Sequence, residues 1–163
     1  MSAKPFLLTV VIAATGWWAY TILFPSPEKQ IQETLQRLAA KASFSPDEKA
    51  LARLGAMNAV PSFFHSNAVL RVSSQAYSGS LEGRAEIREA IASSRAGARS
   101  LDIRLTDPQI TLSSATEAEL VVTATVILDA DPNPSLQILR MKMLRSGRRW
   151  LIHSVEPIQL NEL

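Results

Sequence analysis

The sequence predicts an α+β domain preceded by one transmembrane helix. Three observations lead to this fold class. Residues 6–24 contain no charged side chain, as expected of a membrane span. Residues 27–61 carry two helix-start signals followed by apolar residues at helical spacing. Residues 101–158 largely alternate between apolar and polar side chains, which is typical of antiparallel strands. Helices followed by a run of strands favour a sheet with helices packed on one face.

The size and composition of the chain allow one ordinary domain. Without the apolar segment, roughly 135 of the 163 residues remain, which is too few for two domains. Apolar residues make up 47% of the chain and charged residues 20%, so this part can bury a core and is not a disordered tail. The absence of cysteine excludes disulfides, thiolate nucleophiles and cysteine-ligated zinc.

The charge distribution argues against a nucleic-acid partner. The formal net charge is only +2, and no run of five or six like charges occurs. Nucleic-acid binders usually present a clustered basic face. The one local accumulation of basic residues consists of Arg140, Lys142, Arg145, Arg148 and Arg149. We therefore expect no nucleic-acid binding.

The apolar segment, FLLTVVIAATGWWAYTILF, is interpreted as a membrane anchor. As a helix, residues 6–24 measure about 28 Å, close to the thickness of a bilayer core. A cleaved signal peptide is the alternative, but the bulky Trp17, Trp18 and Tyr20 stand where small residues should mark a cleavage site. Lys4 before the segment predicts a single-pass protein of the cell membrane, with its N-terminus inside and its domain on the extracytoplasmic, periplasmic side.

The expected organisation therefore has three parts. Residues 1–24 form the anchor, residues 25–28 a proline-containing linker, and residues 29–163 the α+β domain. The first helix is expected over residues 27–42, overlapping the linker. Ser26 is its N-cap, Pro27 occupies the first helical position, and Ile31, Leu35 and Leu38 share one stripe.

A second helix with a similar start is expected from Ser45. Pro46 follows the cap, and Asp47 and Glu48 lie near the positive end of the helix dipole. Its apolar stripe would consist of Leu51, Leu54 and Met57, and Pro61 would break or kink it.

The remaining elements follow from the same rules. Residues 68–74 predict a strand, residues 77–83 a loop, and residues 84–95 a short helix closed by Gly97. Four further strands are expected at residues 101–112, 117–128, 136–145 and 150–158. The alternation slips at Asp107-Pro108, which indicates a bulge. Leu139, Met141 and Met143 are expected to pack in the core rather than to form a ligand-binding site.

Three short stretches resemble the nuclear transport factor 2-like (NTF2-like) family, including its SnoaL-like members. They are FF at 63–64 before the strand AVLRV at 68–72, GSLEGRAEI at 79–87, and GRRWLI at 147–152. The resemblance covers about residues 27–158. It implies a cone-like fold, in which a curved antiparallel sheet packs against about three helices and encloses a pocket. The family includes isomerases, dehydratases, cyclases and assembly domains, so the fold does not decide the function.

Two histidines are candidates for catalysis. Enzymatic members of the family often carry an acidic residue or a histidine after the aromatic end of the second helix, where this chain has His65-Ser66-Asn67 and no Asp. His65 is either a general base or a cap of that helix. His153 either lines the pocket or is a satisfied core residue. Two histidines far apart in sequence, without acidic residues at ligand spacing, predict no metal site, and no cofactor is expected.

Candidate ligand contacts are Tyr77, His153 and Trp150. The tyrosine hydroxyl could donate a hydrogen bond to a pocket ligand, and Trp150 is also expected to be buried in the closing strand. The tether favours a non-catalytic ligand-binding or protein-assembly module. A protein partner or a homodimer would use the sheet face carrying Arg140 and Lys142. The alternative is a small lyase or isomerase that acts on a hydrophobic molecule with a pocket histidine.

Overall fold

The computed structural model describes residues 25–73 and 78–158. Within these ranges the chain forms three α-helices, one 3-10 helix and six strands. In chain order they are α2 (Pro27–Ala42), α3 (Ala50–Ala59), η1 (Val60–Phe63), β1 (Phe64–Ser73), β2 (Ser78–Glu82), α4 (Gly83–Gly97), β3 (Leu101–Leu112), β4 (Glu117–Leu128), β5 (Ser135–Ser146) and β6 (Arg149–Pro157). The predicted anchor, residues 6–24, lies outside these ranges. None of the described helices has the length and apolar character needed to cross a membrane.

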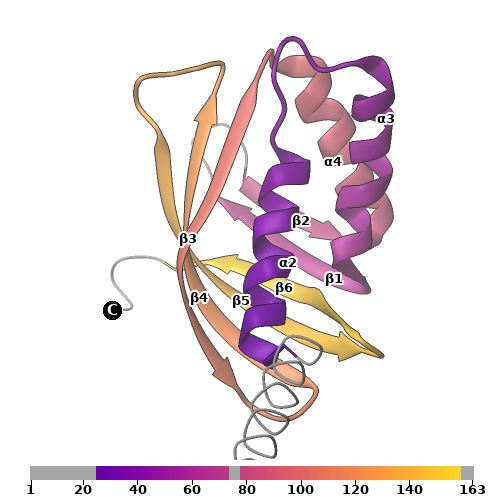
Figure 1. Ribbon diagram of the computed structural model, residues 1–163. Helices are drawn as coiled ribbons and strands as arrows, with labels where there is room; N and C mark the ends of the chain where they lie inside the picture. The colour runs from indigo at the N-terminus through magenta and orange to yellow at the C-terminus, as the bar shows by residue number, and fades with distance from the viewer. Residues whose placement is uncertain (1–24, 74–77, 159–163) are drawn as a thin grey trace, which may run out of the picture.

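The six strands form one curved sheet in the order β2-β1-β6-β5-β4-β3 (Figure 1). Neighbouring strands are antiparallel except for β1 and β6, which run parallel. The prediction of a purely antiparallel sheet is therefore wrong at this one pairing. The exception is a long-range contact between the first and last strands of the described chain, which no local pattern reveals.

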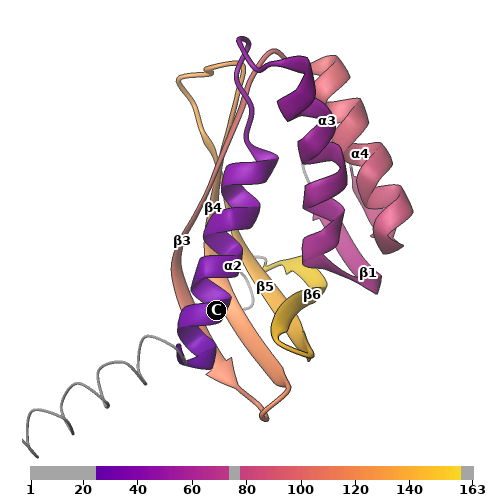
Figure 2. The same cartoon turned by 45° about the vertical axis from the view of Figure 1, so that its right-hand side comes forward.

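The helices lie on the concave side of this sheet. Figures 1 and 2 show α2 along the long strands β3 and β4, with α3 and α4 beside β1. Helix α2 starts as the sequence predicts: Ser26 is its N-cap and accepts a hydrogen bond from the Lys29 amide at 3.3 Å. Its predicted stripe of Ile31, Leu35 and Leu38 is buried. Because the helix begins at Pro27, part of the expected linker 25–28 is already helical.

Helix α3 differs most from its prediction. It begins at Ala50 rather than directly after Ser45, and only Ala56 is fully buried. Leu51 and Leu54 are 84% and 59% exposed, so the predicted stripe does not enter the core. A tertiary contact accompanies the late start, because Glu48 pairs with Arg95 of α4 instead of capping a first turn.

Strand β1 begins at Phe64, several residues before the expected start at 68, and therefore includes His65. The reading of His65 as the cap of a helix end is wrong, because η1 ends at Phe63. Strand β2 occupies most of the predicted loop 77–83. Gly83 opens α4 with a φ of +73°, and a Cβ there would lie 3.1 Å from the Ser66 carbonyl oxygen, so this turn favours glycine.

The four C-terminal strands confirm their predictions closely. The register of β3 on β4 shifts between Thr106 and Gln109, and Asp107 has a φ of 52°, which is the predicted bulge. Met141 and Met143 of β5 are 3% and 0% exposed, as expected of a core face. Leu139 and Met141 also line the internal cavity, so for these two residues the prediction of a purely structural role is not confirmed. Trp150 of β6 is 2% exposed.

Candidate functional site

A cavity of about 320 Å³ lies between α2, α4 and the concave face of the sheet. This volume falls in the range of small-molecule sites. Most of its wall consists of aliphatic and aromatic side chains. They are Leu38, Ala39, Ala42, Phe44, Val60, Phe64, Leu70, Leu81, Ile87, Ala90, Ile91, Leu101, Ile103, Leu105, Ala124, Val126, Leu139, Met141, Ile152 and Val155.

Small side chains account for the open space. Ala39 and Ala42 face the cavity from α2, Ala90 from α4 and Ala124 from β4. The larger Leu139 of β5 faces it from the sheet. Since protein interiors pack closely, alanines on facing elements leave volume that the longer side chains do not fill. The sequence thus provides a cone with an incompletely filled interior.

The remaining lining residues are Ser94, Arg95 and Gln137. The Ser94 hydroxyl donates to the Ala90 carbonyl at 2.8 Å, a bond within α4. The Arg95 side chain is 3% exposed and pairs with the carboxylate of Glu48. Its guanidinium also lies 4.7 Å from the ring centre of Phe44. Nη2 of Arg95 donates to the Lys41 carbonyl at 3.3 Å, while its buried Nε has no partner within the described chain.

No histidine, aspartate or glutamate is among the described residues that line this cavity. His65 and His153 lie on the other side of the sheet. Phe64 and Ile152 are register partners of β1 and β6 and both line the cavity, so the following residue on each strand faces away from it. An uninterrupted strand would place His153 and Val155 on the same face. A register shift between Lys142 and Met143 of β5 interrupts this alternation, so Ile152 and Val155 both face the cavity and His153 does not.

The structure nevertheless brings the two histidines together. Their ring centres are 5.7 Å apart, with the planes at 78°. Nδ1 of His65 accepts a hydrogen bond from the Asn67 amide at 3.4 Å, whereas Nδ1 of His153 is buried without a partner in the described residues. No set of three potential metal-ligating side chains occurs in residues 25–73 and 78–158. The pair alone therefore offers too few ligands for a tetrahedral metal site.

The other predicted contacts fall outside the cavity. Trp150 does not line it but borders a cleft at the start of α2. Tyr77 lies outside the described residues. On the outer sheet face, Arg140 pairs with Glu156 at 3.5 Å and Lys142 with Glu119 at 3.1 Å. Both side chains remain partly exposed.

Sequence reasoning missed Arg95 as a cavity residue. The signal was present, because Arg95 continues the four-residue spacing of Ile87 and Ile91 on the inward stripe of α4. A charged residue on such a stripe requires a partner. Its partner, Glu48, is 47 residues away in the sequence, so spacing could not identify it.

The comparisons with known proteins agree with this architecture. A family model described as SnoaL-like domain matches residues 31–156. No curated protein is significantly similar in sequence. An NTF2-like protein with a cystatin-like fold from Novosphingobium aromaticivorans superposes with a TM-score of 0.65 at 16% identity, covering 90% of each chain.

Two further solved structures from the same organism are similar in fold. One, provisionally assigned as an aromatic ring hydroxylase, has a TM-score of 0.64 at 17% identity and covers 83% of this chain and 92% of its own. The other, provisionally assigned as a scytalone dehydratase, has a TM-score of 0.58 at 10% identity, covering 81% and 84%. At these identities the likeness concerns the fold alone.

Proposed function

The chain belongs to the SnoaL-like domain family, and we propose that it is a membrane-anchored, extracytoplasmic member that binds an apolar small molecule without transforming it. One observation carries the proposal: the cavity wall is apolar, and its described residues include no imidazole or carboxylate. A general base has to lie within hydrogen-bond reach of the proton that it removes. The described part of the wall therefore supports binding and offers no general base.

The one charged side chain in the described part of the cavity wall, that of Arg95, indicates what the ligand carries. The charge of Arg95 is compensated by Glu48, and its side chain is held against Phe44. Arg95 is therefore poorly placed to act as a proton donor in catalysis. Its buried Nε–H is still without an acceptor in the described chain. Buried donors normally have a partner. A ligand with an aliphatic or aromatic body and one acceptor oxygen, such as a hydroxyl or a carbonyl, would supply it once a neighbouring side chain moves aside, because Nε is itself covered.

Filling the cavity tests this proposal. In Ala124→Phe the ring takes up ligand space, and we expect occupancy by 1-octanol to fall at least about tenfold. Thr123→Phe is the matched control, because Thr123 neighbours Ala124 in β4 but does not line the cavity. Native mass spectrometry of the full chain released from neutral micelles counts the bound alcohol. Equal occupancy in both variants, with unchanged thermal melts, would contradict the proposed site.

A lyase or isomerase acting on a hydrophobic molecule is the second candidate. The fold likeness to the assigned scytalone dehydratase and the juxtaposed His65 and His153 favour it. Native mass spectra of the protein extracted with its natural ligand distinguish ligand binding from catalysis. A bound molecule released intact supports binding. Conversion that stops in His65→Ala or His153→Ala supports the enzyme.

The proposed anchor makes its own prediction. If residues 6–24 span the bilayer uncleaved, the protein extracted from membranes has the intact mass of all 163 residues and resists alkaline extraction. The bulky Trp17-Trp18 and Tyr20 are the reason to expect no cleavage. Intact-mass measurement decides the point. A mass lacking roughly the first twenty residues would establish a signal peptide instead.

For assembly, we propose the outer sheet face around Arg140 and Lys142 as the surface for a protein partner or a second copy. Both residues are in ion pairs on a partly exposed face. Surface pairs of this kind contribute little to stability, about 0–1 kcal/mol, so exchanging them for contacts with a partner costs little.

A further inference from the structure

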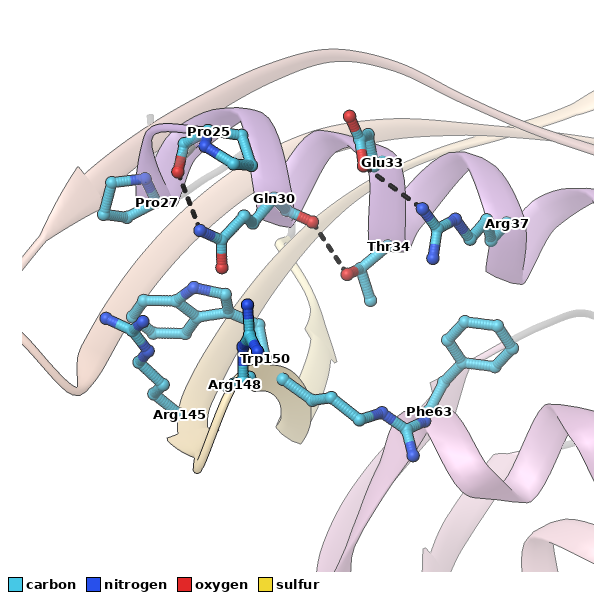
Figure 3. A pocket seen from close by; sticks show the side chains of 11 residues that line it. Pro25, Pro27, Gln30, Glu33, Thr34, Arg37, Phe63, Arg145, Arg148 and Trp150 are labelled. Atoms are coloured by element: carbon cyan, nitrogen blue, oxygen red, sulfur yellow. Dashed lines mark hydrogen bonds and ion pairs between the residues drawn. The ribbon is translucent and has the colours of Figure 1, made fainter. Parts of the chain in front are cut away.

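A second and larger hollow lies where α2 begins. This start-of-α2 cleft has a volume of about 850 Å³ and is formed by the first turns of α2, η1 and the turn between β5 and β6. Figure 3 shows its side chains. They are Pro25, Pro27, Gln30, Glu33, Thr34, Arg37, Phe63, Arg145, Arg148, Arg149 and Trp150.

Positive charge dominates the cleft: its lining has four arginines and a single carboxylate, that of Glu33. Glu33 is engaged by Arg37 within α2 at 3.2 Å. Arg149 donates to the Ser62 carbonyl at 3.3 Å, which leaves its charge uncompensated. Arg145 and Arg148 have no ion pair within the described chain, and Figure 3 shows them on either side of the Trp150 indole.

The cleft also contains a donor that lacks an acceptor. Trp150 is 2% exposed, and its Nε1 is buried without a hydrogen-bond partner in the described residues. In Figure 3 this nitrogen is turned towards the first turns of α2. A buried indole N–H normally finds a partner. An acceptor entering the cleft can reach it once a flanking side chain moves aside.

We propose that the start-of-α2 cleft binds the phosphate group of an anionic phospholipid. Guanidinium groups match phosphate oxygens in charge and in bidentate geometry, and the start of a helix adds a favourable dipole. The choice of a lipid rests on the anchor in the proposed function. Pro25 lines the cleft and directly follows residues 6–24, so a spanning segment would place the cleft at the headgroup level.

A titration of the full chain in neutral detergent tests the site. Replacing Trp17 and Trp18 by Phe leaves Trp150 as the single tryptophan, whose indole N–H signal is then followed by ¹H–¹⁵N NMR. The probes are short-chain phosphatidylglycerol, short-chain phosphatidylcholine and inorganic phosphate. We expect a saturable shift with phosphatidylglycerol, which weakens as salt is added.

Arginine variants identify the residues responsible. Arg145→Gln and Arg148→Gln should each raise the half-saturating concentration about tenfold, the usual effect of losing one charge-assisted hydrogen bond. Arg88→Gln is the matched control, because Arg88 is exposed on α4 and does not line the cleft. The proposal is overturned if phosphatidylcholine gives the same shift or the cleft variants behave like the control. Saturation by inorganic phosphate at the same concentration would overturn the lipid assignment.

The choice of a lipid rests on the proposed anchor, but the titration can succeed or fail separately from the proposed function. The titration in micelles needs neither a spanning segment nor an occupied cone. If the N-terminus proved to be cleaved or the cavity empty, the proposed function would fail, but the titration could still show binding. If the titration showed no binding, the phospholipid site would fail while the proposed function stood.

Discussion

Truncating Trp150 to alanine is expected to lower the free energy of unfolding by about 3–5 kcal/mol, the range for large aromatic side chains removed from a core. Trp150 is 2% exposed and packs in β6 with the core that includes Ile31 and Leu35 of α2. Removing it leaves a void between the closing strand and the helices. Urea unfolding of the full chain in micelles, followed by far-UV circular dichroism, measures the loss.

Two further variants show whether lost packing causes the loss of stability in Trp150→Ala. Trp150→Phe keeps most of the ring surface and removes an N–H that has no partner in the described chain, so its loss should be clearly smaller. Leu136→Ala changes a residue that is 65% exposed and should leave stability nearly unchanged. The burial argument fails if Trp150→Ala shifts the transition no more than Leu136→Ala does.

Removing Glu48 is expected to have an effect of similar size. Glu48→Ala leaves the guanidinium of Arg95 buried without its counter-charge, and breaking such a pair typically costs about 3–5 kcal/mol. The side chains of Arg95 and Glu48 are 3% and 15% exposed, so water compensates little. The same denaturation measurement applies.

The matched control is Glu33→Ala, which breaks the exposed pair with Arg37 within α2. Its loss should stay within about 0.5 kcal/mol, because exposed pairs at this helical spacing contribute little. The double replacement of Arg95 by Met and Glu48 by Leu should be far milder than Glu48→Ala, since apolar side chains at both positions leave no unpaired buried charge. Equal losses for Glu48→Ala and Glu33→Ala would contradict the ascribed role of the buried pair.

The elements that the sequence predicts well depend on local interactions. Ser26 and Pro27 begin α2 through a cap and a permitted first-turn proline, whatever lies around them. The bulge in β3 follows from a proline that cannot donate to the ladder. The alternation over residues 117–128 marks one buried face, so β4 was predictable with its boundaries.

The candidate site was less predictable because its residues meet through distant contacts. The expected inward position of His153 assumed an unbroken alternation, and the register shift opposite Lys142 and Met143 changes which residues face the cone. The late start of α3 accompanies the pair between Glu48 and Arg95, which joins elements on different parts of the chain. Neither effect has a signature within a short window of sequence.

By itself, the sequence determined the α+β class, the order of the elements other than η1 and β2, and the apolar segment ahead of them, because periodicity, caps and turn residues act over a few neighbours. Only the tertiary structure decided which residues face the cavity and which lie on the outer side of the sheet. Curvature of the sheet encloses alanines and Arg95 in a cavity, while the histidines remain on its outer side. Pairing of β5 with β6 brings Arg145 and Arg148 to the start of α2, more than a hundred residues earlier in the chain, because the closure of a sheet depends on all of its strands together.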